Sequence, residues 1–432
     1  MGFLGRMLLP FLSAVEFFLY KGMCISAHSR AFLYVFHSVH NKLVLKVYRD
    51  TFITPSLYTL MTIMQKRRLG RTDLKVSVIG FGGIPIIALS RGEAEKVVRY
   101  AYERGINYFD TARAYGDSEE KIGAALKDVR DDVVIATKTH QRTKEDAARA
   151  GLKQSLRNLQ TDWIDIVQLH GIDDEQTLKK AMSPNGSLTA LKEAKKQGKI
   201  SYIGISGHNP YILVKAIKTG EFDTVLVPLS VMNRTATEEL IPLAKELDVG
   251  VIIMKAMGGC GGPLQFPQRG ARFLGKPELD WPDPSEFIVQ FGKDGIERAW
   301  RSLRFVLAHD VSTVIPGFRS IEEIDYAVEV AENFKGLTPE EKEIYKFGEL
   351  PPEPFCRECG LCMPCPDGVE IPTILRWDLY YTFYNIKNWT RDQYPKLRTK
   401  VNSCTECGKC EEKCPYNLPV ISMLKKAEKR LS

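Results

Sequence analysis

Eight of the ten cysteines of this 432-residue chain stand in two short runs near its end. The first run is CRECGLCMPCP and the second is CTECGKCEEKCP, and the eight positions are Cys356, Cys359, Cys362, Cys365, Cys404, Cys407, Cys410 and Cys414. The second run has the CxxCxxCxxxCP spacing of a two-cluster iron–sulfur sequence, and the first is one residue shorter before its last cysteine. A disulfide framework would instead spread its cysteines through the fold. The spacing therefore predicts ligands for two [4Fe-4S] clusters in a reducing, cytoplasmic compartment.

Zinc is the alternative for such a group of thiolates. Structural zinc sites usually split their ligands into two separated pairs around one ion, and they do not place four at every third residue before a proline. Eight thiolates satisfy two four-iron clusters with none left over. In the usual cross-ligation, the first three cysteines of each run share a cluster with the last cysteine of the other run. Cys414 would then complete the cluster of the first run, and Cys365 that of the second run. The shorter spacing in the first run leaves this pairing open.

Four further residues could carry proton chemistry, because they close or follow successive apolar runs. Asp110 closes INYFDTA with Tyr115 just beyond it, Lys138 closes VIATKT, and His170 closes IDIVQLH. Each alone could be a helix cap, a loop aromatic, a surface charge or a core histidine. Together they suit the reduction of a carbonyl by hydride, in which Tyr115 is the general acid and the Lys138 ammonium favours its phenolate form. Asp110 would keep Lys138 charged, and His170 would donate a hydrogen bond to the substrate oxygen.

The elements that must position these residues alternate regularly along the chain. Eight apolar, β-branched runs are separated by charged amphipathic stretches such as 91–105 and 147–160, and the runs are 76–82, 106–112, 133–139, 164–170, 200–206, 223–229, 250–256 and 312–318. Buried parallel strands with helices between them are typical of a (β/α)8 barrel, an α/β fold whose chemistry lies at the C-terminal ends of the strands. A short hairpin should precede the first strand. The alternative, an open dinucleotide-binding sheet, fits poorly because the GFGGIP loop has Pro85 in place of its third glycine.

Residues 64–335 resemble the aldo-keto reductase family, whose catalytic tetrad matches these four residues in type, order and strand position. The resemblance implies a nicotinamide cofactor, with Ser206 at its carboxamide and the VIPGFRS loop, including Gly317, Arg319 and Ser320, at its phosphates. Arg319 could pair with a 2'-phosphate, so NADP(H) is expected, with NAD(H) as the alternative. Three positions depart from the family pattern. Leu226 stands where glutamine is usual, Lys255 where an aromatic residue is usual, and Ala327 where asparagine is usual. Lys255 receives no role from the sequence.

The resemblance extends over residues 64–432 to family members with a C-terminal ferredoxin-like domain. The expected function is an oxidoreductase that moves a hydride to or from a small carbonyl or alcohol substrate, with clusters that serve electron transfer or structure. An external electron-transfer partner fits the first of these roles. The alternative is an electron-transfer or docking protein whose barrel senses the redox state of the nicotinamide pool. Hydride moves two electrons and a cluster moves one, and no flavin-binding signal is present to convert between them.

Composition sets the domain plan. A 44% hydrophobic and 26% charged chain is typical of globular domains, and its net charge of +7 includes no long basic tract, so neither nucleic acid nor a membrane is an expected partner. Residues 1–63 are aromatic and poor in charge, and we expect a mis-assigned start or a disordered extension, with a targeting segment or a real structural element as alternatives. The barrel should span 64–348, with the segment 258–295 forming much of the substrate wall. A proline-rich linker then leads into a helix-rich, ferredoxin-like domain over 349–432.

Overall fold

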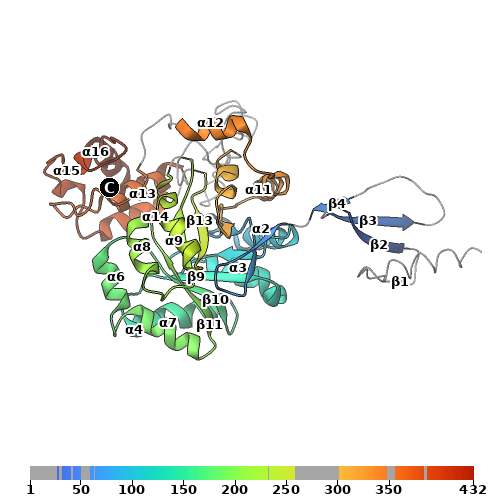
Figure 1. Cartoon of the computed structure of the whole chain (residues 1–432). Coiled ribbons are helices and arrows are strands. Elements are labelled where there is room, and N and C mark those ends of the chain that lie inside the picture. Colours follow the sequence, from blue (N-terminus) through green and yellow to red (C-terminus); the bar gives the residue numbers. More distant parts are fainter. Residues whose placement is uncertain are drawn as a thin grey trace, which may run out of the picture. The chain divides into compact units, whose positions relative to one another are not determined.

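The computed structural model describes residues 27–28, 32–39, 42–49, 59–62, 64–231, 233–257, 301–347, 356–383 and 387–432. These residues form two compact units, Met1–Met64 and Gln65–Ser432 (Figure 1). The predicted substrate-wall segment 258–295 and the proline-rich linker lie outside the described residues, as do Cys24 and Cys260. None of the described helices is long and apolar enough to cross a membrane.

The N-terminal unit contains a four-stranded antiparallel sheet in the order β1-β2-β3-β4. Its strands are Ala27–His28, Phe32–Val39, Lys42–Arg49 and Thr59–Thr62. The central pair, FLYVFHSV and KLVLKVYR, is rich in the β-branched and aromatic residues that favour strands. These four segments form strands in the structure, and the nature of residues 1–63 in the natural protein stays a prediction. The position of the natural start stays a prediction.

The second unit is built on eight parallel strands in the order β7 to β14. Their bounds are Phe81–Gly82, Tyr108–Asp110, Val134–Thr139, Ile164–Leu169, Ile200–Ser206, Thr224–Pro228, Gly250–Met254 and Thr313–Val314. Parallel bridges from Ile79 to Val314 and from Gly82 to Gly317 connect the first strand to the last. The predicted (β/α)8 barrel is therefore confirmed.

The first predicted strand is divided between two sheets. Its start, β6 (Lys75–Ser77), pairs antiparallel with β5 (Lys66–Arg68) as the predicted hairpin, and only Phe81–Gly82 joins the barrel. Leu69 of this hairpin is fully buried in one apolar cluster with inward residues of the strands, so the hairpin closes the N-terminal end of the barrel. Gly70 is required there, because its φ is +53° and an added Cβ would lie 2.1 Å from the Gly250 nitrogen.

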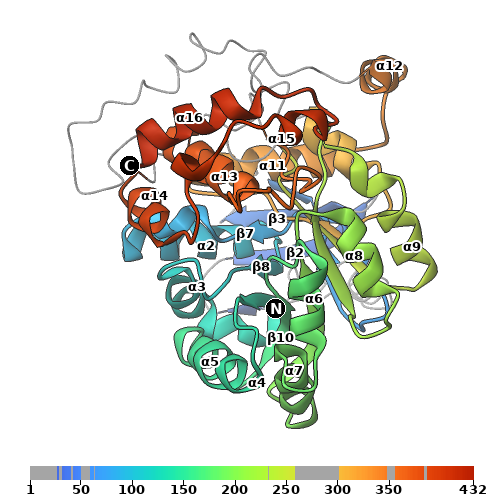
Figure 2. The same ribbon diagram turned by 90° about the vertical axis from the view of Figure 1, so that its left-hand side faces the viewer.

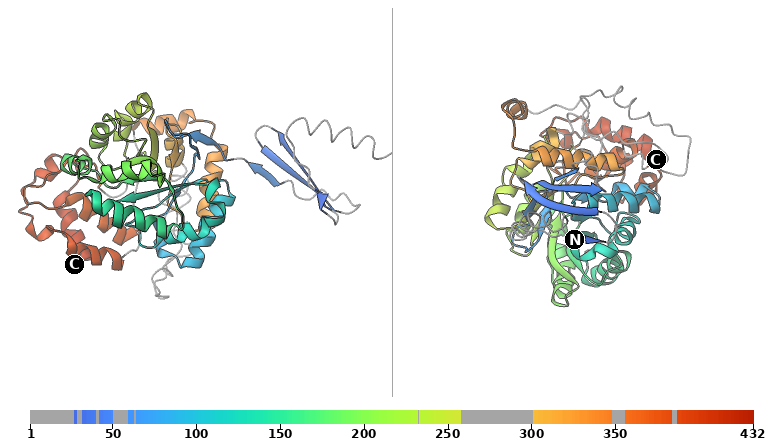
Figure 3. Two further views of the ribbon diagram at one scale, coloured as in Figure 1. Left: turned by 90° about the horizontal axis from the view of Figure 1, so that it is seen from below. Right: turned by 90° about the vertical axis from the view of Figure 1, so that its right-hand side faces the viewer.

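Helices pack outside the strands (Figures 2 and 3). They are α2 Arg91–Glu103, α3 Ser118–Leu126, α4 Lys144–Asp146, a π-helical turn Ala147–Leu152 that continues into α5 Lys153–Asn158, α6 Glu175–Met182, α7 Ser187–Lys196, α8 Pro210–Ile217, α9 Leu240–Glu246 and α11 Ile321–Asn333. Short 3-10 turns lie at Pro85–Ala88, Lys127–Asp132 and Thr235–Thr237, and α12 is Pro339–Phe347. Ser90 and Glu93 form a capping box at the start of α2, which fixes where that helix begins.

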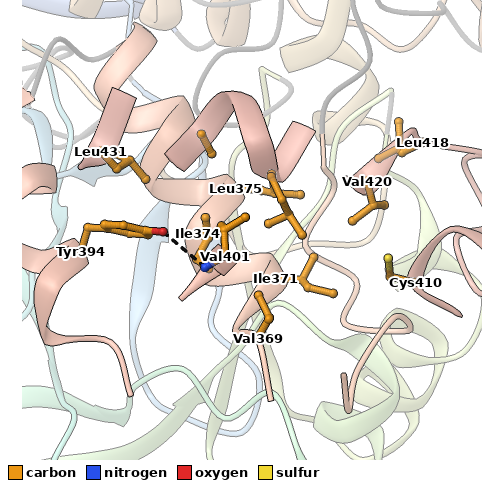
Figure 4. Packing of buried hydrophobic residues seen from close by; sticks show 12 residues of the cluster. Val369, Ile371, Ile374, Leu375, Tyr394, Val401, Cys410, Leu418, Val420 and Leu431 are labelled. Carbon is orange, nitrogen blue, oxygen red and sulfur yellow. Dashed lines mark hydrogen bonds between the residues drawn. The ribbon is translucent and has the colours of Figure 1, made fainter. Parts of the chain in front are cut away.

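The C-terminal part of the second unit is helical, as predicted. Its helices are α13 Ile371–Phe383, α14 Lys387–Gln393, α15 Lys409–Glu412 and α16 Val420–Leu431, with 3-10 turns at Tyr394–Lys396 and Val401–Ser403. A separate apolar core holds them together, and Figure 4 shows members of this core, among them Ile371, Leu375, Tyr394 and Leu431. Cysteines of both runs pack against this core, so the ligand loops and the helices fold as one domain.

This domain lies against loops that follow barrel strands. Asn233 Nδ2 donates to the Arg357 carbonyl at 3.3 Å, and the Thr235 and Tyr416 hydroxyls are 3.4 Å apart. Both barrel residues follow β12 at its C-terminal end. This cysteine-rich helical domain therefore covers part of the face where a barrel of this kind carries its chemistry.

Candidate active site

Asp110 and Lys138 form a buried ion pair at the C-terminal ends of β8 and β9. Lys138 Nζ contacts Asp110 Oδ1 and donates to the Thr111 carbonyl at 2.7 Å. The Lys138 and Asp110 side chains are only 1% and 3% exposed. Gln168 of β10 adds a weak hydrogen bond to the other carboxylate oxygen at 3.4 Å. The pair thus fixes an ammonium group beneath the open end of the barrel.

Tyr115 and His170 stand beside this ammonium. Lys138 Nζ lies 4.8 Å from the centre of the Tyr115 ring, and the Tyr115 hydroxyl forms a hydrogen bond with it. The Tyr115 and His170 rings meet edge to face, with centroids 5.7 Å apart. The structure therefore brings together all four residues that the sequence singled out.

A second histidine, His140, accompanies His170 and was not predicted. The two rings lie 3.9 Å apart at an angle of 34°. Burial, assisted by the charge of Arg142, lowers the pKa of His140 to about 4, and burial together with His140 and Lys138 lowers the pKa of His170 well below its usual value. Both rings are therefore neutral at physiological pH. The only sequence signal was the place of His140 two residues after Lys138, at the end of the same strand.

The four residues open into one cavity of about 510 Å³. Its wall also includes Gly82 and Gly83 after β7, Ser206 at the end of β11, and the Pro316–Gly317 loop after β14. Leu226 and Lys255, two of the departures from the family pattern, line it as well. A cavity of this size matches the clefts that bind small molecules and cofactors.

The four predicted cofactor contacts take different places. Ser206 and Gly317 line the cavity, whereas Arg319 and Ser320 are not on its wall. The Ser320 hydroxyl accepts a hydrogen bond from the Glu323 N–H at 3.3 Å and caps α11. The Glu323 carboxylate in turn accepts the Arg319 N–H at 2.6 Å, so an acidic side chain already holds this loop.

The opposite side of the cavity belongs to the iron–sulfur domain. Thr373, Arg376, Trp377 and Tyr380 of α13 line the same cavity as the four residues predicted to be catalytic. Glu358, which lies between the first two cysteines, pairs with Lys255 through Oε1 and with Arg376 Nε through Oε2 at 2.6 Å. Lys255 thus gains a partner that sequence reasoning missed, because the two residues are 103 positions apart.

The cysteines surround two small hollows. One is lined by Cys356, Cys359, Cys362 and Cys414, and the other by Cys362, Cys365, Cys404, Cys407 and Cys410. All eight are free thiols. Within the described ranges, no three or more His, Cys, Asp or Glu side chains are grouped around a point as one metal ion would need. Thiols that surround a hollow fit a four-iron cluster better than a single tetrahedral zinc ion.

Comparisons with known proteins agree with this geometry. The aldo/keto reductase family model matches residues 78–345, and that of a 4Fe-4S dicluster domain matches 355–419. An uncharacterized oxidoreductase of Bacillus subtilis, YqkF, is 29% identical over 298 residues, which are 64% of this chain and 94% of that protein. L-galactose dehydrogenase of Arabidopsis thaliana is 31% identical over 64% of this chain and 91% of its own length.

Among solved structures, the holo form of the aldo-keto reductase AKR11C1 from Bacillus halodurans is similar, with a TM-score of 0.53 and 30% identity. It aligns with 66% of this chain and 97% of its own. These matches span nearly the whole of each relative but about two thirds of this chain. This chain belongs to the aldo/keto reductase family, and a 4Fe-4S dicluster domain follows its barrel.

Proposed function

We propose that the barrel transfers a hydride between a nicotinamide cofactor and the carbonyl or hydroxyl carbon of a small substrate. The observation that carries this proposal is the convergence of the four predicted catalytic side chains on one cavity. A buried ammonium, a tyrosine hydroxyl and a neutral imidazole are the groups needed to manage the proton and the developing charge.

The cavity suits a nicotinamide cofactor. It extends from the catalytic residues to the Pro316–Gly317 loop, and the Ser206 hydroxyl is on its wall. The loop leads into the N-terminus of α11, a 13-residue helix whose first N–H groups and dipole favour a phosphate. We expect NADP(H) over NAD(H) because the Arg319 guanidinium can pair with a 2'-phosphate. When bound, the cofactor supplies the hydride in reduction and accepts it in oxidation.

The chain's own residues handle the proton. Lys138 stays charged because Asp110 and the Thr111 carbonyl hold its ammonium in place. This ammonium stabilises negative charge on the Tyr115 oxygen, so Tyr115 can give its proton to the substrate oxygen in reduction and take it back in oxidation. His170, being neutral, donates a hydrogen bond to the same substrate oxygen and supports the charge that develops there.

Anaerobic initial rates with NADPH or NADH and a panel of aldehydes, ketones and alcohols test this proposal. We expect turnover, a higher kcat/KM with NADPH, and a loss of about 10²- to 10⁴-fold in kcat for Tyr115→Phe with cofactor binding retained. Tyr102→Phe is the matched control, because its hydroxyl bonds the distant Asp132. Full turnover by Tyr115→Phe would contradict the proposed mechanism.

We further propose that the eight cysteines hold two [4Fe-4S] clusters in the cross-ligated arrangement. Cys414 shares a hollow with the first three cysteines of the first run, and Cys365 with those of the second run, which supports this pairing. Such clusters supply one-electron chemistry when assembled. Adding NADPH alone to the anaerobic protein separates two roles: bleaching of the clusters would favour a nicotinamide sensor or electron carrier, and unchanged clusters during carbonyl reduction would favour a structural or partner-facing domain.

A further inference from the structure

One face of α13 forms a wall of the catalytic cavity. Thr373, Arg376, Trp377 and Tyr380 follow the i, i+3, i+4, i+7 spacing of a single helix face, and all four line the cavity that contains the tetrad. The barrel thus supplies the reacting groups, and the iron–sulfur domain supplies side chains that a substrate would meet. Arg376 is the cation of this face.

Glu358 positions Arg376. The Arg376 Nε donates to Glu358 Oε2 at 2.6 Å, while the other carboxylate oxygen pairs with Lys255. The Glu358 side chain is 4% exposed and that of Arg376 is 20% exposed. A single buried carboxylate is therefore shared by two cations, and the guanidinium is held in one orientation at the cavity wall.

The terminal nitrogens of Arg376 remain available to a ligand. Among the residues that the structure describes, Nε is the one Arg376 nitrogen with a hydrogen bond. Asp173 also lines the cavity and attracts this guanidinium, but its oxygens already accept the N–H groups of His208 and Asn209 and face the His208 ring. A planar guanidinium with two free terminal NH2 groups matches the two oxygens of a carboxylate.

The guanidinium lies within electrostatic reach of the reacting groups. Burial is the main cause of the lowered pKa values of His140 and His170, and the Arg376 charge contributes to both. Arg376, His140 and His170 all line one cavity, so a ligand bound by Arg376 would occupy the space onto which both imidazoles open.

We propose that Arg376 binds a carboxylate of the substrate, so that the reductase prefers carbonyl compounds that carry a carboxylate, such as oxo acids with an aldehyde or ketone group. This inference rests on the proposed function, because it names the substrate class of the same site. Arg376 is a binding residue presented by the iron–sulfur domain, and Glu358 is its positioning residue.

Reduction of 4-oxobutanoate and of butanal by the holoenzyme tests the inference, because the two aldehydes differ in the carboxylate. We expect wild type to favour 4-oxobutanoate in kcat/KM, mainly through KM. Arg376→Gln should reduce that preference by about 10- to 100-fold, because it removes a charge-assisted contact with the substrate carboxylate. Arg376→Lys keeps the positive charge beside Glu358 but lacks the planar guanidinium, so we expect a smaller reduction in the preference for 4-oxobutanoate. Arg391→Gln is the control, since Arg391 contacts Tyr381 and the Arg430 carbonyl and does not line the cavity.

Equal preference in wild type, or an unchanged preference in Arg376→Gln, would overturn the inference. Calorimetric titration of the holoenzyme with succinate, in the presence of NADPH, provides a readout that needs no turnover. If Arg376→Gln weakens succinate binding at least about tenfold, the inference is supported even when no carbonyl compound is reduced. The absence of carbonyl reduction would then contradict only the proposed function. Succinate binding that is absent or unaffected by the substitution would sink the inference alone.

Discussion

Lys138 carries its charge in a place where burial opposes a charge. Burial by itself would lower the pKa of this lysine, but the neighbouring Asp110 carboxylate and Tyr115 outweigh it, and the pKa lies above its ordinary value. The residue is therefore an ammonium throughout the neutral range. Because Lys138 lies beside the Tyr115 ring, its charge acts on the hydroxyl that we propose exchanges a proton with the substrate.

The stacked histidines show the opposite behaviour. His140 and His170 have no carboxylate in hydrogen-bond contact among the described residues, and Lys138 adds a positive charge nearby. Their imidazoles stay neutral, which leaves each ring one N–H to donate. This suits a site that must stabilise negative charge on a substrate oxygen without giving up a second proton.

The neutral state of His140 predicts a dependence of stability on pH. The folded protein does not protonate this ring until about pH 4, whereas the unfolded chain does so below about 6.5. Protons therefore bind the unfolded state first, and the free energy of unfolding should fall as the pH drops from about 6.5 toward 4. Urea unfolding at several pH values between 7.5 and 5.5 should show a smaller loss for His140→Gln than for wild type.

Protein groups surround the His140 ring, but the residue as a whole is exposed where it lines the cavity, so solvent weakens the effect of its burial. The difference in slope should therefore be well below the 1.4 kcal/mol per pH unit that corresponds to one proton. Gln141→Ala, a change of the next residue that leaves the imidazole in place, should retain the wild-type slope. Identical slopes for His140→Gln and wild type would mean that the ring titrates normally in the folded protein.

The convergence of the four proposed catalytic residues was predictable because barrel geometry places strand ends side by side. Asp110, Lys138 and His170 end successive strands, so their order in the chain already determines which of them meet. Glu358 and Arg376 were not predictable in this way. Their contacts with the barrel depend on how a second domain sits on the strand ends, and no spacing in the sequence encodes that placement.

Among the elements, the two cysteine runs are the parts whose arrangement the structure sharpens most. Cys365 lines the hollow of the second run, and Cys414 lines that of the first. If the proposed clusters occupy these hollows, neither run completes a four-iron site alone. The chain between the runs, which includes α13 and α14, brings the two runs together around one core.

Double cysteine substitutions test whether each cluster takes its fourth ligand from the other run. If ligation follows the hollows, Cys365→Ser with Cys404→Ser damages one cluster, and the protein should keep about half of the wild-type iron and sulfide. Cys359→Ser with Cys365→Ser damages both clusters and should leave little of either. Iron and sulfide analysis of anaerobic preparations provides the measurement. The reverse pattern would show that each run binds its own cluster.

The strand and helix pattern was readable over most of the barrel. The parallel strands are nearly continuous apolar runs because both faces are buried, and their positions agree with the sequence to within a few residues. The prediction for the first barrel strand, 76–82, was wrong in detail. Lys75–Ser77 pairs with Lys66–Arg68 in the hairpin, and only Phe81–Gly82 joins the barrel. A continuous apolar run does not reveal where a strand changes from one partner to another.

At the scale of the whole molecule, the barrel and the iron–sulfur domain share charged residues that neither could bury alone. Lys255 and His208 come from the barrel, Arg376 comes from α13, and Glu358 lies between them. Nearby cations, Arg376 first, lower the pKa of Glu358 to about 2 despite its burial. The carboxylate is therefore ionised at neutral pH, and it joins the two domains.

The chain contains a natural comparison for Glu358. CRECG and CTECG place Glu358 and Glu406 at equivalent positions, and both have left-handed backbone, with φ of +60° and +58°. Both N–H groups donate to the preceding cysteine sulfur, Cys356 at 3.3 Å and Cys404 at 3.4 Å. Their side chains differ in surroundings, because Glu406 pairs with Lys425 at the surface, where the two side chains are 53% and 54% exposed.

Substitution of Glu358 and of Glu406 distinguishes the role of the glutamate in its cysteine loop from its role in the contact between the domains. Glu358→Gln leaves two partly buried cations without their shared carboxylate and should lower the free energy of unfolding by about 3 kcal/mol. Glu406→Gln removes an exposed ion pair at the equivalent loop position and should cost less than about 1 kcal/mol.

Anaerobic urea unfolding, followed by circular dichroism and by cluster absorbance, should give coincident transitions in wild type, because one compact unit contains both domains. In Glu358→Gln the cluster signal should be lost first. Equal effects of the two substitutions would place the importance of this glutamate in the ligand loop and not in the contact with the barrel.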